Sequence, residues 1–388
     1  MKKEEKAGIF IKMKCNNLLR KLKNEYINRR GFHTDRKIIV IESDDWGSIR
    51  VPSKAIYEDL EKLGDPCASD AFLRYDSLER KEDIEQLVDV LCKYKDKNGR
   101  HPCVTANFAV ANPNFEKIIP GQQVYSYEPF TTTYEKYFGS NNGIMNIIKE
   151  AMNNHLFLPQ LHCREHMNVS RWMTNLCAGN ADTMLAFAKN MIGVGASFSK
   201  ENHFGYMDAL NYDSEKELDE LRKIIIDASK IFEKEFGYKS KTFVASCFVW
   251  TSAIEEILAK IGIEMIQTQF KQNICPFKGT SLMFHKFHYS GQMNKYGQVY
   301  SVRNCEYEPA YDHQYQRRAS ACIKQIKEAF AYGKPAVINS HRLNYISAID
   351  SKNGTIGLYG LEYILKTITE TEPEIEFLSS EELSSIIH

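Results

Sequence analysis

The sequence predicts an α/β fold in which parallel strands curl into a barrel or an incomplete barrel. Short apolar segments, typical of buried strands, alternate with amphipathic helical segments along most of the 388 residues. Polar residues with catalytic chemistry follow several of these strands. Because chemistry in such folds lies at the carboxyl ends of the strands, we expect the functional residues there.

The expected elements follow from this alternation. We expect strands at Ile38–Glu42, Cys103–Val110, Phe157–Leu161, Val194–Phe198, Thr242–Cys247, Glu264–Thr268, Gln298–Arg303 and Ala336–Ser340. We expect helices at Lys54–Leu63, Glu82–Tyr94, Gly143–Asn153, Thr183–Met191, Glu215–Phe236, Ser252–Ile261, Ala319–Tyr332 and Leu358–Thr369. Ser214 and Glu217 predict a capping box for the longest helix, and Gly237 predicts its end. Residues 112–140 and 270–298 interrupt the pattern and are expected to be long loops over the site.

The charges divide the chain into an arm, residues 1–36, and a barrel domain, residues 37–388. The whole chain is neutral, yet its first 37 residues carry twelve Lys or Arg against four Asp or Glu. Apolar residues at helical spacing within Lys12–Tyr26 predict a basic helix, either docked on the barrel or lying on an anionic membrane surface. Ten scattered Cys predict reduced thiols and a cytoplasmic location. The membrane alternative for the arm would place the protein peripherally at the inner membrane face. No nucleic-acid module is recognisable, so nucleic acid is not an expected partner.

Two adjacent carboxylates, Asp44 and Asp45, follow the first predicted strand. Like charges so close raise each other's pKa, and a divalent metal would relieve that repulsion. Taken alone, such a pair is also common at a solvated strand end or a helix cap. Its position at the carboxyl end of a strand favours a functional role.

Two imidazoles, His162 and His166, stand four residues apart, so one helical turn would bring them to the same face. Two His and one Asp are a common zinc ligand set. The segment also reads His-x-x-Glu-His, as in inverted zincins. That alternative needs another ligand and leaves the Asp pair and His341 unexplained, so we favour a metal site that includes an Asp.

The ordered motifs resemble those of the polysaccharide deacetylase family. They are Ser43-Asp44-Asp45-Trp46, then His162-x-x-x-His166, then Ser246-Cys247-Phe248-Val249-Trp250, and then Asn339-Ser340-His341. The resemblance covers about Lys37 to Tyr345 and implies the distorted, incomplete (β/α) barrel of that family. It implies that Asp45, His162 and His166 ligate a divalent metal such as zinc. It also implies that Asp44 is the general base and His341 the general acid.

Two departures from the family pattern affect catalysis. The third motif of the family usually contains an Arg before Pro-Tyr, and the segment Phe243–Phe248 has neither Arg nor Pro. The acidic residue that usually orients the acid His is not recognisable, and Glu306, Glu308 and Asp312 are the candidates. The reaction or its tuning could therefore differ from that of the family.

Each Trp of the chain lies beside one of these motifs. Trp46 follows the Asp pair, Trp172 follows the His pair and Trp250 follows the third motif. Aromatic faces stack on sugar rings, so we expect these three residues to bind substrate, although any one of them could be a core residue.

Together, these features predict a metal-dependent hydrolase that removes an acyl group, most simply by N-deacetylation or O-deacetylation, from a carbohydrate or a glycan precursor. A metal amidohydrolase acting on a small non-sugar amide remains open. So does a catalytically altered glycan-binding protein.

Overall fold

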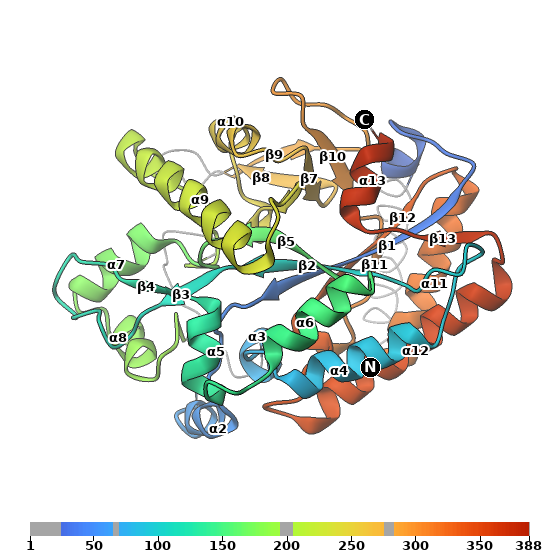
Figure 1. Ribbon diagram of the computed structural model, residues 1–388. Helices are drawn as coiled ribbons and strands as arrows, with labels where there is room; N and C mark the ends of the chain where they lie inside the picture. Colours follow the sequence, from blue (N-terminus) through green and yellow to red (C-terminus); the bar gives the residue numbers. More distant parts are fainter. Residues whose placement is uncertain (1–24, 65–69, 195–204, 275–282, 388) are drawn as a thin grey trace, which may run out of the picture.

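The computed structural model describes residues 25–64, 70–194, 205–274 and 283–387. A parallel sheet lies at the centre of the molecule, with the strand order β10-β7-β6-β5-β2-β1-β12-β11 and with β13 paired to β1 (Figure 1). The strands of this sheet are β1 (Lys37–Trp46), β2 (Val104–Ala109), β5 (Phe157–Cys163), β6 (Thr242–Val244), β7 (Met265–Thr268), β10 (Val299–Val302), β11 (Cys305–Glu306), β12 (Ala336–His341) and β13 (Ile375–Phe377). The predicted α/β class and incomplete barrel are confirmed.

Helices cover the outside of this sheet and bury its apolar face. The α-helices are α2 (Lys54–Lys62), α3 (Ala71–Tyr75), α4 (Lys81–Cys92), α5 (Phe130–Phe138), α6 (Ile144–Asn153), α7 (Val169–Cys177), α8 (Ala181–Ala188), α9 (Glu215–Phe236), α10 (Ser252–Lys260), α11 (Tyr315–Ala331), α12 (Ser351–Thr371) and α13 (Ser380–Ile387). Figure 1 shows α4, α6 and α12 in one group and α9 and α10 in another. The main core lies between the sheet and these helices.

Side-chain alternation along β1 separates the outer core from the barrel interior. Ile39 and Ile41 belong to the main core, whereas Ile38 and Val40 pack with residues of α13 in a second cluster. Glu42 continues the inward series, and its carboxylate accepts a hydrogen bond of 2.7 Å from the Ser380 hydroxyl at the start of α13. The interior is therefore apolar at its base and becomes polar toward the carboxyl ends of the strands.

The bounds predicted for the longest helix, α9, are confirmed. The Ser214 hydroxyl accepts a hydrogen bond from the Glu217 N–H, and Gly237 ends the helix at a φ of 83°. A left-handed φ of this kind costs glycine little, which is why the helix ends there. Strong capping and clear 3.6-residue periodicity made α9 readable from sequence.

The two regions predicted to be long loops contain regular structure, so that prediction is wrong. Residues 112–140 include most of a hairpin of β3 (Ala111–Pro113) and β4 (Tyr127–Pro129), followed by α5. Residues 270–298 include the antiparallel pair of β8 (Lys271–Ile274) and β9 (Phe284–Phe287). Strands of three or four residues are too short to show a clear alternation of apolar and polar positions.

The predicted strand Val194–Phe198 lies almost entirely outside the described residues, as does most of the predicted basic helix Lys12–Tyr26. The described part of the arm, residues 25–36, contacts the barrel. The Phe32 N–H donates to the Ser290 carbonyl at 2.8 Å, and the Thr34 N–H donates to the Gly333 carbonyl at 2.8 Å. Within the described ranges, every helix is too short or too polar to cross a membrane.

Candidate metal and catalytic site

Two strand irregularities aim the predicted ligands at one point. Between the β1–β2 pairs Ser43↔Ala106 and Trp46↔Phe108, two β1 residues, Asp44 and Asp45, face a single β2 residue. Neighbouring side chains of a regular strand point to opposite faces, whereas a bulge re-aims one of them. Asp45 accordingly has a φ of 75°, in the left-handed region.

A second irregularity places His162. On β5, the partners of Phe108 and Ala109 are Leu161 and Cys163, so His162 is an additional residue in that ladder. His166 lies on a bend between β5 and α7 and not on a helical turn. The predicted helical turn is therefore wrong, although the two imidazoles do lie together, with ring centroids 4.8 Å apart.

Asp45, His162 and His166 form a compact group of buried ligand atoms. The Asp45 Oδ1 atom lies 3.4 Å from His162 Nε2 and 3.2 Å from His166 Nε2. One potential ligand atom from each residue lies within 4.8 Å of the others. The structure thus brings together the three residues predicted to hold the metal.

The state of the two imidazoles suits metal binding. His162 Nδ1 is 2.8 Å from the Val244 carbonyl, so this nitrogen donates its proton and Nε2 is left as the acceptor. His166 Nδ1 is buried and has no hydrogen-bond partner among the described residues. Burial lowers the pKa of His166 to about 3, which keeps this ring neutral and able to ligate. An Asp and two His fit a zinc-like ion.

Asp44 is held by donors of the chain itself. Arg303, which directly follows β10, donates from its two terminal nitrogens to the Asp44 carboxylate oxygens at 2.6 and 2.8 Å. Asn107 donates to the same carboxylate at 2.8 Å. Burial raises the pKa of Asp44, but the charge and hydrogen bonds of Arg303, together with the charges of His162 and His341, lower it to about 2. Asp44 is therefore ionised at neutral pH.

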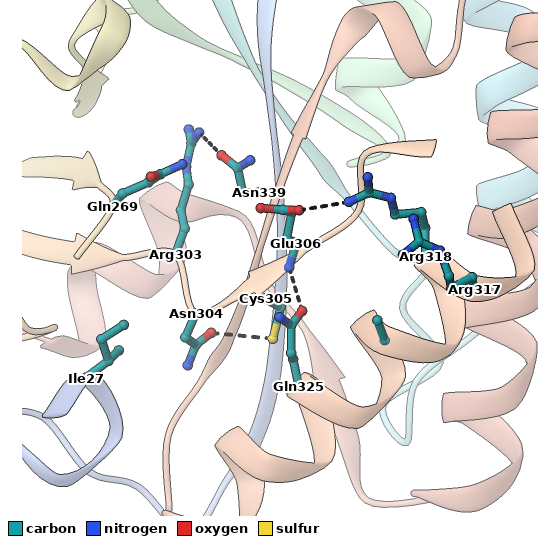
Figure 2. Close-up of a pocket in the computed structure, with 11 residues that line it drawn as sticks. Ile27, Gln269, Arg303, Asn304, Cys305, Glu306, Arg317, Arg318, Gln325 and Asn339 are labelled. Carbon is teal, nitrogen blue, oxygen red and sulfur yellow. Dashed lines mark hydrogen bonds and ion pairs between the residues drawn. The ribbon is translucent and has the colours of Figure 1, made fainter. Parts of the chain in front are cut away.

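Arg303 is a functional residue that sequence reasoning missed. It also donates to Glu42 at 2.5 Å. Figure 2 shows a further hydrogen bond of Arg303, to Asn339 at 2.7 Å. Arg303 places a cation beside the proposed base in a chain whose third motif lacks the Arg usual in the family. One sequence signal existed, since Arg303 ends the predicted strand Gln298–Arg303 at the edge where the chemistry is expected.

His341 faces Asp44 and is oriented by Glu308. Residues 44 and 341 are register partners on β1 and β12, and His341 Nε2 lies 4.0 Å from Asp44 Oδ2. Its Nδ1 atom is 2.6 Å from Glu308 Oε1. Burial lowers the pKa of His341, but the Glu308 charge and hydrogen bond, with the charges of Asp45 and Asp44, raise it to about 10. Of the three candidate orienting acids, the structure thus selects Glu308.

A buried charge network supports the wall beside His341. Arg50 lies 3.4 Å from Asp45 and 3.5 Å from Asp76, the residue that ends α3. Arg342 donates to the other Asp76 oxygen at 2.8 and 3.0 Å. These contacts fix α3, whose Phe72 ring meets the His341 ring edge to face at 5.2 Å. Phe72 therefore forms an apolar wall of the site that the sequence did not reveal.

The three tryptophans are core residues, and this corrects the expectation that they bind substrate. The exposed fractions of Trp46, Trp172 and Trp250 are 0%, 0% and 1%. Each indole N–H donates within the protein, to the Ser43 hydroxyl, the Ile192 carbonyl and the Glu255 carboxylate. No ring face is left for a sugar, because packing of these large side chains builds the core behind the motifs.

A family model matches part of the chain. Residues 205–363 match the model of glycosyl hydrolase family 57. No curated protein matches the chain.

Three similar solved structures come from bacteria and an archaeon. A protein assigned to the polysaccharide deacetylases in Mycobacterium smegmatis has 10% identity and a TM-score of 0.43, covering 92% of this chain and 93% of that chain. Another from Pseudomonas aeruginosa PAO1 has 9% identity and a TM-score of 0.45, with 90% and 91% covered. The 4-alpha-glucanotransferase of Thermococcus litoralis has 9% identity and a TM-score of 0.45, with 90% and 40% covered.

The polysaccharide deacetylases indicated by the motifs are thus among the proteins to which this chain is similar. At these identities and TM-scores the similarity concerns overall shape.

Proposed function

We propose that this protein is a metal-dependent hydrolase that removes an acyl group from a carbohydrate or glycan precursor, with N-deacetylation as the principal reaction. The observation that carries this proposal is the convergence, at the carboxyl ends of β1, β5 and β12, of the Asp45–His162–His166 group with Asp44 and a Glu308-bound His341. A bound zinc-like ion would supply Lewis acidity toward the acyl carbonyl.

The side chains divide the proton transfers. Asp44, ionised and fixed by Arg303, accepts the proton of the attacking water. His341, with its raised pKa, carries a proton at neutral pH and gives it to the departing amine. Burial of Asp44 excludes bulk water from its proton transfer.

The family-57 match raises a glycosidase as a second candidate. Glycosidases generally need two carboxyl groups flanking the scissile bond. Within residues 205–363, the buried described carboxylates are Asp208, Glu255 and Glu308, and each is hydrogen-bonded to neighbouring side chains. Of these three, only Glu308 is hydrogen-bonded to a residue of the site, His341, so they do not form a pair of carboxyl groups there, and this favours the deacetylase.

The test is acetate release from N-acetyl and O-acetyl sugars by purified protein with measured metal content, beside small non-sugar amides and a reducing-sugar assay. We expect metal-dependent acetate release from a sugar substrate. Release of reducing ends alone would favour the glycosidase. Activity confined to non-sugar amides would favour an amidohydrolase, and saccharide binding with no turnover would favour a binding protein.

A further inference from the structure

The sheet nearly closes into a barrel at a seam between its two edge strands, β10 and β11. These strands are far apart in the sheet order, yet only Arg303 and Asn304 separate them along the chain. Three peptide units span at most about 11 Å, so the two edges approach closely. A pocket of about 310 Å³, here called the seam pocket, lies at this point (Figure 2).

The seam pocket is separate from the reacting groups. Its lining includes Gln269 after β7, Glu306 on β11, and Arg318 and Gln325 on α11, but none of Asp44, Asp45, His162, His166 or His341. The pair Arg303–Asn339 forms part of its wall (Figure 2). Both residues also serve the catalytic groups, because Arg303 binds Asp44 and Asn339 donates to Glu308 at 3.1 Å.

The charges of the seam pocket are compensated by the protein. Arg303 is paired with Asp44 and Glu42. Arg318 is paired with Asp312 at 2.9 Å and with Glu306 at 3.4 Å, and Arg317 also contacts Asp312. Each guanidinium that lines the pocket thus has a carboxylate partner, so the pocket does not offer an anion an unpaired cation.

The polar groups of the seam pocket that are available to hydrogen-bond a ligand are side-chain carboxamides. The half-buried Gln269 side chain makes no hydrogen bond to the described part of the chain. Gln325 accepts a hydrogen bond from the Glu306 N–H at 2.9 Å, and its side-chain NH₂ has no partner among the described residues. An amide offers both donors and acceptors, which matches the mixed donor and acceptor character of a hydroxyl group.

We propose that the seam pocket is a second binding site, for one or two units of an uncharged saccharide. Its volume lies at the lower end of the range for small-molecule sites. Gln269 and Gln325 would hydrogen-bond the sugar hydroxyls, in a pocket whose wall residues Arg303 and Asn339 also contact Asp44 and Glu308. Saccharide binding in the seam pocket does not depend on the proposed function. The identification of this saccharide as part of the glycan hydrolysed at the metal site does rest on the proposed function.

The test measures binding of glucose tetramer, which has no acyl group to lose, and of N-acetylglucosamine tetramer to the full chain by titration calorimetry. Replacing Gln269 or Gln325 by Leu should weaken binding of at least one tetramer roughly 2- to 10-fold, as expected for one lost hydrogen bond. Gln316→Leu is the matched control, because Gln316 is exposed on the same helix and does not line the pocket. Release of an acyl group from a small aryl acetate should be unchanged in all three variants.

Equal affinities in the three variants, or no binding of either tetramer, would overturn the proposal. So would inorganic phosphate binding more tightly than the tetramers in a manner that requires the two glutamines, since this would define an anion site. Glutamine-dependent saccharide binding in a protein without acyl-release activity would uphold the seam pocket and reject the proposed function.

Discussion

Asp44 and Asp45 are neighbours in sequence, yet their surroundings differ in kind. The Asp44 oxygens are occupied by N–H donors of Arg303 and Asn107. The Asp45 carboxylate instead faces two imidazole nitrogens and receives one long contact of 3.4 Å from Arg50. The hydrogen-bonding capacity of Asp44 is therefore met by N–H donors of the protein. Asp45 instead belongs to a group of side chains suited to binding a cation. The bulge in β1 makes this division possible, because it turns adjacent side chains into one site.

The largest effect on activity is expected from removing the charge of Asp44. Asp44→Asn should lower kcat/KM for an N-acetyl sugar by roughly 10²- to 10⁴-fold, because the variant cannot accept a proton. Its metal content should remain that of the wild type. Wild-type activity in this variant would show that Asp44 is not the base.

Removing the cation that satisfies Asp44 should be costly for folding. Arg303→Met leaves Asp44 and Glu42 buried without their charge partner, so the free energy of unfolding in urea should fall by about 3–5 kcal/mol. Arg317→Met is a suitable control, because the Arg317 side chain is 62% exposed and paired at the surface. Its loss should cost no more than about 1 kcal/mol. Equal stability losses would contradict the distinction between the buried and the exposed pair.

His341, like Asp44, is held by groups of the protein and should not be a metal ligand. His341→Ala should depress amide hydrolysis by roughly 10²-fold while largely sparing an aryl acetate, whose leaving group needs no proton. Parallel rate measurements on the two substrates check this. Equal losses would assign His341 to oxyanion stabilisation or pocket shape, and loss of metal would make it a ligand.

The smallest effect on activity is expected from replacing Glu308, the partner of His341, and this effect depends on pH. Glu308 raises the pKa of His341, so the protonated acid is present below about pH 10 and is lost as the pH rises through that value. In Glu308→Gln the pKa should fall toward the ordinary 6.5, which leaves about 3% of the acid form at pH 8. Amide hydrolysis should therefore fall roughly 30-fold at pH 8 but little at pH 6. An unchanged pH–rate profile would remove Glu308 from this role.

The residues that could be predicted from sequence are those whose position follows from local pattern. The buried run Ile38–Ile41 identified β1, and Asp45, His162 and His166 stand at strand ends where a barrel concentrates chemistry. Strand periodicity could not reveal the bulges, because an extra residue in a ladder depends on the partner strand. The expected helical turn at His166 failed because β5 continues through Cys163 and the chain then bends before α7 begins.

The residues that could not be predicted act through long-range contacts. Arg303 reaches Asp44 across 259 positions, and no local motif marks it. Glu308 could be named only as one of three acids until the register of β12 placed His341 beside it. The tryptophans were predicted to bind substrate because they lie beside the motifs in sequence. That proximity instead reflects packing in the core behind the site.

The most direct test of this account compares the two neighbouring carboxylates by metal analysis of purified Asp44→Asn and Asp45→Asn proteins. The two substitutions are chemically identical and one position apart. We predict that Asp44→Asn retains the wild-type amount of a zinc-like metal and that Asp45→Asn loses most of it, because two His alone rarely hold zinc. Wild-type metal content in Asp45→Asn, or equal loss in both variants, would contradict the assignment.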